Sequence, residues 1–459
     1  MKSTLISVCA RLLFPLLSFL IFFLLSFSSY AYPVSANYRL SMHGFTYSSN
    51  QAPSPTQELQ AVSVKQEILL ASDGRFRTVE EKQFPGGIVF QYLTTGTQAG
   101  MDSADIWQWR DGTELLHFDA AETRAYLADY LYLSPMLMYK AQAAHPDQRK
   151  MDREHGASYE QDFTDIAGRI ARLKFDRATN LVISATLGTT IYEYADFDSS
   201  VIQPQPRRIT KKVAGIVRAE WQLHLEPVST VSDADFQLPA IYHRSQRQET
   251  MRATQIAENT FRIDGAASGY HTAFVVGEHS IAVFDTPLNP KEGERLRAFI
   301  EKTVPGKKIN YVVYSHTHGD HIGGGTAFLH DGVSYLTGKE GTVRISKVLG
   351  AQVAGKTKEL TGEYELDLGG RQIRIFPFLS THASDMLIAY DPVSQIIFQG
   401  DLFALPEVGP IPVGFPVNQQ LEQFIKARRL PVKLIVSVHG RSGTLSELAE
   451  TVKRKNSMQ

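Results

Sequence analysis

Alternating hydrophobic and polar positions dominate the first half of the chain. In the clearest stretches apolar side chains recur at about every second position, and these stretches are residues 62–70, 88–93 and 106–109. A period of two is typical of amphipathic strands with one face buried. The segments 172–175 and 181–187 flank a turn-rich stretch and predict an antiparallel hairpin.

One helical segment, residues 122–144 with a break at Pro135, interrupts these strands. A curved antiparallel sheet with a helix laid against its concave face accounts for this order of elements. We therefore predict a β-rich N-terminal domain at residues 32–245 with one helical segment. The basic run that follows Pro204 and Pro206 is interpreted as a solvated loop between strands, and it contains Arg207, Arg208, Lys211 and Lys212.

This predicted domain loosely resembles the half-barrel of periplasmic lipoprotein carriers. The resemblance implies a groove for a lipid, and contact with a lipid or a membrane surface. The residues of the helical segment that would line such a groove are Tyr126, Leu127, Tyr130, Leu131, Met136 and Leu137. An apolar stripe of this kind more often fills a core, so core packing is the preferred prediction.

The polar segment 243–249 marks a boundary, beyond which short apolar strands alternate with helices. The first set comprises strands at 261–264, 272–276 and 281–285, a helix at 291–303 and a strand at 309–315. The second set comprises strands at 371–378, 386–390 and 395–399, a helix at 418–429 and a strand at 433–438. This order predicts two sheets packed face to face with helices outside, in a domain at 250–459, and an α+β fold overall.

Composition and charge exclude some classes of function. The 459 residues suit two or three domains, and a hydrophobic content of 43% is that of a globular protein. A formal net charge of -1 provides no basic field for a nucleic-acid backbone, so the expected partner is a small molecule. Cys9 is the only cysteine, which leaves no disulfide and no cysteine metal ligand downstream.

The N-terminus has the layout of a secretory signal. Lys2 and Arg11 precede an apolar run at 12–27, and small residues follow at Ser29 and Ala31. We expect residues 1–31 to be a signal peptide that is cleaved after Ala31, and the protein to be periplasmic or secreted. The alternative is a retained membrane anchor, because a run of this length approaches what a bilayer requires.

Four potential metal ligands lie within six residues directly after the apolar strand at 309–315. They are His316, His318, Asp320 and His321. Residues two apart on an extended backbone project to the same side, so the first two histidines can share one metal while the next pair faces another. Glycines at 319, 323 and 324 let the loop fold closely.

Three further candidates also come just after apolar strands: His382, Asp401 and His439. Each alone is a weak signal, because histidines and aspartates are common in loops and turns. Together they obey one rule, since strand ends would gather at one edge of a sandwich. His271, His279 and His330 obey that rule less well and are interpreted as surface residues or as supports of the ligands.

The sequence His-x-His-x-Asp-His, then a lone His, a Gly-Asp and a His-Gly, resembles the ligand set of the metallo-β-lactamase superfamily. The likeness covers about residues 253–452 and implies an αβ/βα sandwich that binds two Zn²⁺, with iron or manganese as possible substitutes. It assigns the first zinc to His316, His318 and His382, the second to Asp320, His321 and His439, and the bridge between them to Asp401.

Two positions narrow the expected chemistry within that superfamily. Asp401 is similar to the bridging carboxylate of glyoxalase II, lactonases and alkylsulfatases. The flavin-dependent di-iron relatives carry Glu where this chain has His318, so this position argues against that branch. We expect a metal-bound hydroxide to attack an ester, thioester or lactone carbonyl, with Asp320 as the catalytic residue that orients it. A β-lactam hydrolase, or a lipid carrier with an auxiliary metal site, remain alternatives. Asp285 is expected either to support a ligating histidine or to cap its strand.

Overall fold

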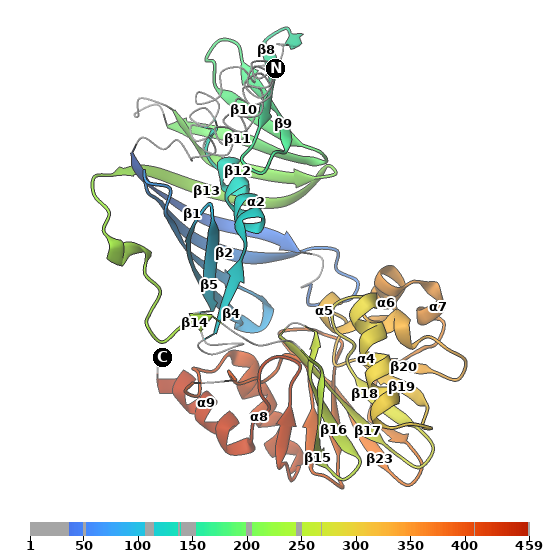
Figure 1. Ribbon diagram of the computed structural model, residues 1–459. Coiled ribbons are helices and arrows are strands. Elements are labelled where there is room, and N and C mark those ends of the chain that lie inside the picture. Colours follow the sequence, from blue (N-terminus) through green and yellow to red (C-terminus); the bar gives the residue numbers. More distant parts are fainter. Residues whose placement is uncertain are drawn as a thin grey trace, which may run out of the picture.

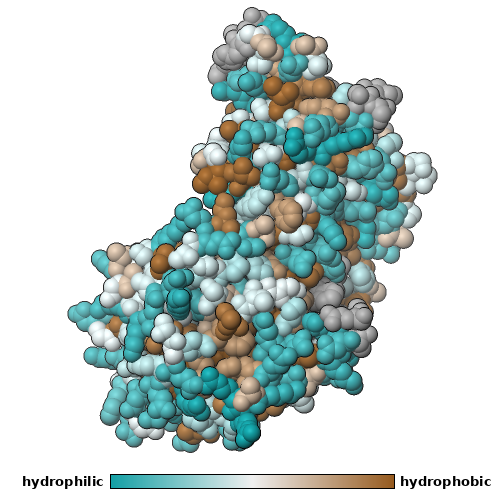
Figure 2. Space-filling model, turned by 180° about the vertical axis from the view of Figure 1, so that it is seen from behind, coloured by the Kyte–Doolittle hydropathy of each residue, from teal (hydrophilic) through white to brown (hydrophobic). Residues whose placement is uncertain are grey.

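The computed structural model describes residues 36–48, 52–105, 114–135, 138, 153–198, 204–244, 250–267, 269–407 and 409–457. The N-terminal half is a large sheet, and the C-terminal half is a layered body of sheets and helices (Figure 1). Viewed from behind, the surface of both parts is mostly hydrophilic with apolar residues scattered in small groups (Figure 2). The predicted signal peptide, residues 1–31, lies outside the described residues. None of the described helices is long and apolar enough to span a bilayer.

The N-terminal sheet has fourteen strands among the described residues. They are β1 (Asn37–Ser48), β2 (Gln60–Leu70), β3 (Phe76–Gln83), β4 (Val89–Thr97), β5 (Gly100–Asp105), β6 (Glu114–Phe118), β7 (Arg153–His155), β8 (Ser158–Thr164), β9 (Ile170–Asp176), β10 (Val182–Leu187), β11 (Thr190–Asp198), β12 (Gln205–Val213), β13 (Ile216–Val228) and β14 (His243–Arg244). Their order is β14-β6-β5-β4-β3-β2-β1-β13-β12-β11-β10-β9-β8-β7, and every pair is antiparallel except β14 with β6. This confirms a large antiparallel sheet, including the β9–β10 hairpin.

The helix is α2 (Ala120–Leu131), and residues 136, 137 and 139–144 of the predicted helix 122–144 lie outside the described part. Its start is fixed by a capping box, because Asp119 accepts hydrogen bonds from the N–H groups of Ala121 and Glu122. Two short 3-10 helices, η1 (Pro85–Gly87) and η3 (Asp233–Phe236), complete this half. The predicted strand 106–109 also lies outside the described residues.

The prediction of a solvated loop around Arg207–Lys212 is wrong, because these residues form strand β12. The basic side chains stay at the surface by pairing with acids of the neighbouring strand β11: Arg207 with Asp198, Arg208 with Asp196, and Lys212 with Glu193. Pro206 is tolerated because β13 pairs with β12 only from Arg208 onward. Cross-strand charge pairing is a tertiary property that the local composition does not reveal.

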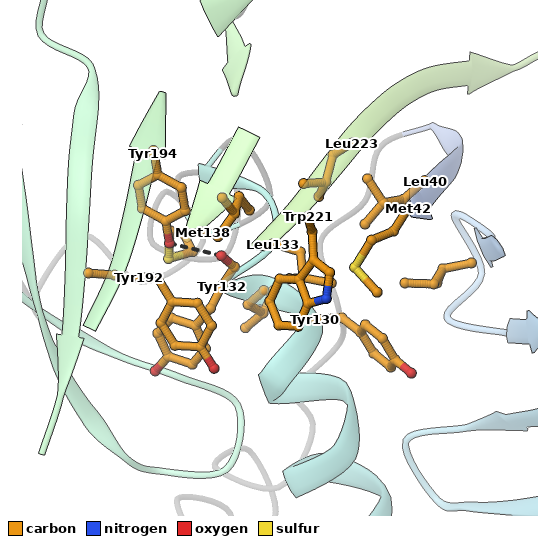
Figure 3. Packing of buried hydrophobic residues seen from close by; sticks show 14 of the residues in the cluster. Leu40, Met42, Tyr130, Tyr132, Leu133, Met138, Tyr192, Tyr194, Trp221 and Leu223 are labelled. Carbon is orange, nitrogen blue, oxygen red and sulfur yellow. Dashed lines mark hydrogen bonds between the residues drawn. The ribbon is translucent and has the colours of Figure 1, made fainter. Parts of the chain in front are cut away.

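Helix α2 packs its apolar side chains into the sheet as core (Figure 3). The Tyr194 hydroxyl donates to the carbonyl oxygen of Tyr132 at 2.9 Å, and the Tyr132 ring stacks on Tyr192 with centroids 5.1 Å apart. The predicted groove residues Tyr126, Leu127, Tyr130 and Leu131 belong to this cluster, so the prediction of core packing is confirmed for them. Met136 and Leu137 lie outside the described residues.

The C-terminal half contains a seven-stranded and a five-stranded sheet. The first holds β15 (Arg252–Ala257), β16 (Thr260–Ala267), β17 (Tyr270–Val276), β18 (Ile281–Phe284), β19 (Ile309–Val313), β20 (Ser334–Thr337) and β21 (Thr357–Glu359), in that order. The second holds β22 (Tyr364–Asp367), β23 (Gln372–Phe378), β24 (Met386–Asp391), β25 (Ile396–Phe398) and β26 (Leu434–Val436). Side chains from both sheets share one buried cluster, which includes the stacked rings of Phe284 and Phe398.

Helices cover the outer faces of the two sheets. They are α4 (Pro290–Thr303), α5 (Gly319–Ile322), η4 (Gly325–Phe328), α6 (Gly341–Leu349), α7 (Ala351–Ala354), α8 (Pro416–Arg428) and α9 (Leu445–Ser457). One apolar cluster joins α4 and α6 to the first sheet, and another joins α8 and α9 to the second. This confirms the predicted sandwich with helices outside, whose strand ends meet at one edge.

Candidate metal centre

The loop after β19 brings the first four predicted ligands to the edge of the sandwich. His318 lies on extended backbone, and α5 then turns the chain so that Asp320 and His321 belong to a different group from His316 and His318. A Cβ atom at Gly323 would lie 2.0 Å from the carbonyl oxygen of Leu288, so this tight turn requires glycine. The predicted change of direction within the motif is present.

The remaining candidates come from three other strand ends, after β23, β25 and β26, and they complete two groups. Within each group the potential ligand atoms lie within 4.8 Å of one another, and the groups are His316, His318, His382 and Asp401, and Asp320, His321 and His439. All seven predicted residues are therefore brought together, and Asp401 belongs to the first group. His279 is exposed, and His330 bonds backbone carbonyl groups away from these groups.

Three imidazole nitrogens converge in the first group. His316 Nε2 lies 3.0 Å from His318 Nδ1 and 3.2 Å from His382 Nε2, and Oδ2 of Asp401 lies 3.2 Å from His382 Nε2. A tetrahedral zinc ion with bonds of about 2.1 Å needs neighbouring donors about 3.3 Å apart. The spacing of these atoms fits one such ion.

The second group meets the other oxygen of the same carboxylate. Oδ1 of Asp401 lies 3.0 Å from His321 Nε2 and 3.2 Å from His439 Nε2, while Oδ2 of Asp320 lies 3.7 and 3.9 Å from these two nitrogens. Asp401 thus presents one oxygen to each group, as a bridging ligand would. The donor set of imidazoles and carboxylates suits zinc, iron or manganese.

In four of the histidines, the ring nitrogen that points away from the centre of the site has an oxygen atom within hydrogen-bond distance. His318 Nε2 faces the carbonyl oxygen of Ala52 at 3.2 Å, and His382 Nδ1 faces that of Pro85 at 3.3 Å. His316 Nδ1 lies 3.0 Å from Ser315 Oγ, and His321 Nδ1 lies 3.1 Å from Asp285 Oδ2. Carbonyl and carboxylate oxygens only accept, and the Ser315 hydroxyl donates to Asp285 Oδ2, so it accepts from His316. The proton therefore resides on the outward nitrogen, and the inward nitrogen offers its lone pair to a metal.

Burial and neighbouring charges shift the pKa values of the candidate ligands in opposite directions. Burial, followed by the nearby histidines, lowers the pKa of His316 and His318 well below the usual value. Burial also disfavours charge on His321, but the carboxylates of Asp401 and Asp320 outweigh it and raise the pKa of that histidine. Burial would raise the pKa of Asp401, but His321 and His439 outweigh it and hold the carboxyl ionised.

Several buried polar atoms support a bound cation. Oδ1 of Asp320, Nε2 of His321 and Oδ1 of Asp401 are buried and make no hydrogen bond of acceptable geometry within the described part of the chain, although the last two atoms lie 3.0 Å apart. Buried polar atoms are rarely left in that state, since desolvation without compensation is costly. Cations between these donors would satisfy them, so the residues fit a pair of metal ions.

Asp285 lies beside one of the candidate histidines, as predicted, but the strand that it caps is β19 and not its own strand, β18. Its Oδ1 accepts from the Ser315 N–H at 2.7 Å, which caps the end of β19, and its Oδ2 lies beside His321. Gly400 lets the end of β25 approach this point, because a Cβ atom there would lie 2.3 Å from Ser315 Oγ. Glycine precedes Asp401 because the ends of β25 and β19 pack too closely at residue 400 for a side chain.

Tyr270 was missed by the sequence analysis. Its hydroxyl donates to Asp320 Oδ2 at 3.2 Å, and its ring contacts the His439 ring with centroids 4.6 Å apart. Asp385 was also missed, and its Oδ2 accepts from the N–H and hydroxyl of Thr317 within the motif. A tyrosine at the start of an apolar strand gives no local signal of such a role.

A charged network supports the loop of the last ligand. Arg262 donates to the carbonyl oxygen of Gly440, which follows His439. Buried His271 lies 3.1 Å from Asp264 and 3.2 Å from Glu407. Asp264 also pairs with Arg262 at 3.0 Å, so His271 belongs to the network behind the His439 loop, and it is buried and not a surface residue.

A hollow of about 360 Å³ borders Asp320. Its other lining residues are mostly small or apolar, namely Leu288, Pro290, Gly319, Gly323, Thr326, Val348 and Leu349. A volume in this range suits a small organic molecule.

Comparison with known proteins locates a family match over the same residues. The model of the Metallo-beta-lactamase superfamily matches residues 268–439. A type 2 metallo-beta-lactamase from Bacteroides fragilis is 30% identical over 128 residues, which is 28% of this chain and 49% of the relative. The alpha subunit of 2,4-dinitroanisole O-demethylase from a Nocardioides species is 22% identical over 145 residues, 31% of this chain and 44% of the relative. The chain thus spans about half the length of these curated relatives.

Solved structures with similarity to the chain also cover about half of it. A metallo-beta-lactamase from Pontibacter korlensis is 19% identical, with a TM-score of 0.36, over 45% of this chain and 99% of that one. The Flv1 flavodiiron core from Synechocystis is 17% identical, with a TM-score of 0.38, over 46% of this chain and 61% of that one.

Proposed function

From the metallo-beta-lactamase superfamily domain at residues 268–439, we propose that the protein is a dinuclear zinc hydrolase that cleaves an ester, thioester or lactone. The observation that supports this most directly is Asp401, whose two oxygens face two groups of histidines. The aspartate at this bridging position is the feature that led us to expect a glyoxalase II-like ligand set. Two bound ions would lower the pKa of a water so that hydroxide is available at neutral pH, and would polarise the carbonyl group.

The side chains of the protein have defined tasks in this proposal. Asp320 orients the attacking oxygen and takes up its proton, because its Oδ1 makes no hydrogen bond within the described residues. Tyr270 fixes the carboxylate through its other oxygen, Oδ2. The adjoining hollow, with its apolar sides, would receive the acyl part of a small substrate.

Export and the role of the N-terminal sheet are further parts of the proposal. The signal-like N-terminus would send the protein to the periplasm or outside the cell. A carrier-like N-terminal domain would contact lipids or a membrane surface, but the apolar face of α2 is packed into core. That packing favours the hydrolase over a carrier with an auxiliary metal site.

A β-lactam is the second candidate substrate, favoured by the 30% identity to the Bacteroides fragilis enzyme. The residue at the bridging position opposes it, because Asp401 resembles the bridging carboxylate of glyoxalase II, lactonases and alkylsulfatases. Hydrolysis of nitrocefin decides between these two candidates.

The test is an activity screen of the zinc-loaded protein on esters, thioesters, lactones and β-lactams. We expect turnover of one of the first three classes, and none by the His318→Ala variant. Two bound zinc ions with no turnover of any class would contradict the proposed hydrolase and would favour a carrier.

A further inference from the structure

Two loops of the N-terminal sheet reach the metal centre of the C-terminal half. The loop between β1 and β2 provides the carbonyl oxygen of Ala52 to His318, and the turn between β3 and β4 provides that of Pro85 to His382. These partners are 266 and 297 residues away from their histidines along the chain. In Figure 1 the blue strands of the N-terminal sheet lie over the C-terminal half, with the β1–β2 connection near α5.

The first loop is anchored by Arg344 of helix α6. The Arg344 guanidinium is buried, and it donates to the carbonyl oxygens of Ser54 at 3.0 Å, Gln57 at 3.2 Å and Pro55 at 3.4 Å. The N–H of Ser384 donates to the carbonyl oxygen of Pro53 at 2.7 Å. A charged donor that binds three carbonyl groups of one loop fixes its backbone next to His318.

The second turn fits closely against His382 and helix α8. Gly86 has a φ of 82°, and a Cβ atom there would lie 2.8 Å from Val417 Cγ1 and 3.1 Å from His382 Cβ. Ile88 is 2% exposed and belongs to the apolar cluster under α8. This turn is therefore part of the packing of the C-terminal half.

We propose that these two loops are positioning elements of the metal centre, so that its metal affinity depends on the docked N-terminal sheet. The inference rests on the proposed metal site. The carbonyl oxygens of Ala52 and Pro85 hold the protons of His318 and His382 on their outward nitrogens, which leaves the inward nitrogens free to bind. Both histidines are in the first group, so the effect falls on that group. Loss of such supporting hydrogen bonds typically weakens metal binding by about 10- to 100-fold.

The first test moves the Pro85 turn with Gly86→Ala. The matched control is Gly74→Ala in another turn of the same sheet, where φ is 89° and a Cβ atom meets nothing within 4 Å. Both changes strain the backbone equally, but only the first displaces a loop from His382. We expect zinc affinity, measured by competition with a chromophoric chelator, to fall about tenfold or more in Gly86→Ala and to be unchanged in Gly74→Ala.

The second test releases the Ala52 loop with Arg344→Met, and Lys347→Met on the exposed side of the same helix is its control. Thermal unfolding of the metal-free proteins identifies any variant that fails to fold. If either Gly86→Ala or Arg344→Met fails to fold, the zinc affinity of the other one tests the inference. Wild-type affinity in a folded Arg344→Met or Gly86→Ala protein overturns the inference. If the wild-type protein itself binds no zinc, the proposed function fails instead.

Discussion

The hydroxyl of Tyr270 donates to Oδ2 of Asp320 at 3.2 Å, and this contact connects the start of β17 to the motif after β19. The same tyrosine packs its ring on His439, so one side chain touches two residues of the second group. It orients Asp320 without belonging to either ligand group. Removing the Tyr270 hydroxyl therefore changes the orientation of the Asp320 carboxylate but leaves every candidate metal ligand in place.

We predict that Tyr270→Phe lowers kcat about 10- to 100-fold while the zinc content stays at the wild-type value. The range follows from the loss of a hydrogen bond to a charged group, about 1.5–3 kcal/mol. Steady-state kinetics on the substrate found in the screen, with metal analysis of the same samples, provide the check. A change in KM alone would contradict a role in orienting Asp320.

The approach of β25 to β19 gives a second prediction. Gly400→Ala places a methyl group 2.3 Å from Ser315 Oγ and 3.1 Å from His316 Nδ1. We expect it to destabilise the protein by roughly 1–3 kcal/mol through overpacking and to lower the zinc content. Gly362→Ala is the matched control, because its Cβ atom meets nothing within 4 Å. Denaturant unfolding of the two variants measures the difference, and equal stabilities would refute the packing argument.

The sequence predicted that the seven candidate side chains gather, because each follows a strand whose apolar pattern is local. The ends of β19, β23, β25 and β26 must meet once the two sheets pack, so the candidates His382 and His439 could be gathered without coordinates. The contacts from the N-terminal sheet could not be predicted. Ala52 and Pro85 act through carbonyl oxygens, which every residue has, and the docking of two distant loops leaves no local pattern.

The errors in the N-terminal half have a similar cause. The basic run in β12 was interpreted as a loop because its charges suggest solvent, whereas acids of β11 neutralise them across the sheet. The late start predicted for the helix, residue 122 instead of residue 120, has a local cause, because the capping box of Asp119 and Glu122 was not used in the prediction. Strand pairing between distant segments leaves no such local signal in the sequence.

Metal removal should destabilise the folded protein by mass action. Zinc at about 100 times its dissociation constant adds about 2.7 kcal/mol to the stability of the native state. We expect this to raise Tm by roughly 5 to 10 °C relative to the chelator-treated protein. Differential scanning fluorimetry measures the shift. His318→Ala should show a smaller one, because it lacks a donor of the first group, and a full-sized shift in that variant would argue against zinc binding at this site.

The network behind His439 gives a pH-dependent prediction for Asp264. Burial would raise the pKa of this carboxyl, but the hydrogen bond with His271 and the charge of Arg262 outweigh it and hold the pKa well below the usual value. A pKa lowered in the folded state stabilises the protein above the unfolded-state pKa of about 3.9, and that stabilisation is lost as the pH falls through the folded value. Asp264→Asn should thus cost about 1.5–3 kcal/mol at pH 7, as for hydrogen bonds to charged groups, and progressively less below about pH 4.

Urea unfolding of the metal-free protein between pH 3 and 7 measures this difference, since metal binding has its own pH dependence. Asp331→Asn serves as the control, because the Asp331 side chain is fully exposed and its nearest cation, Lys356, is 3.9 Å away. That variant should match the wild type at every pH, because isolated surface pairs contribute little. A deficit of Asp264→Asn that stays constant down to pH 3 would mean that the lost stability comes from packing, and the charged network would then have no part in holding the His439 loop.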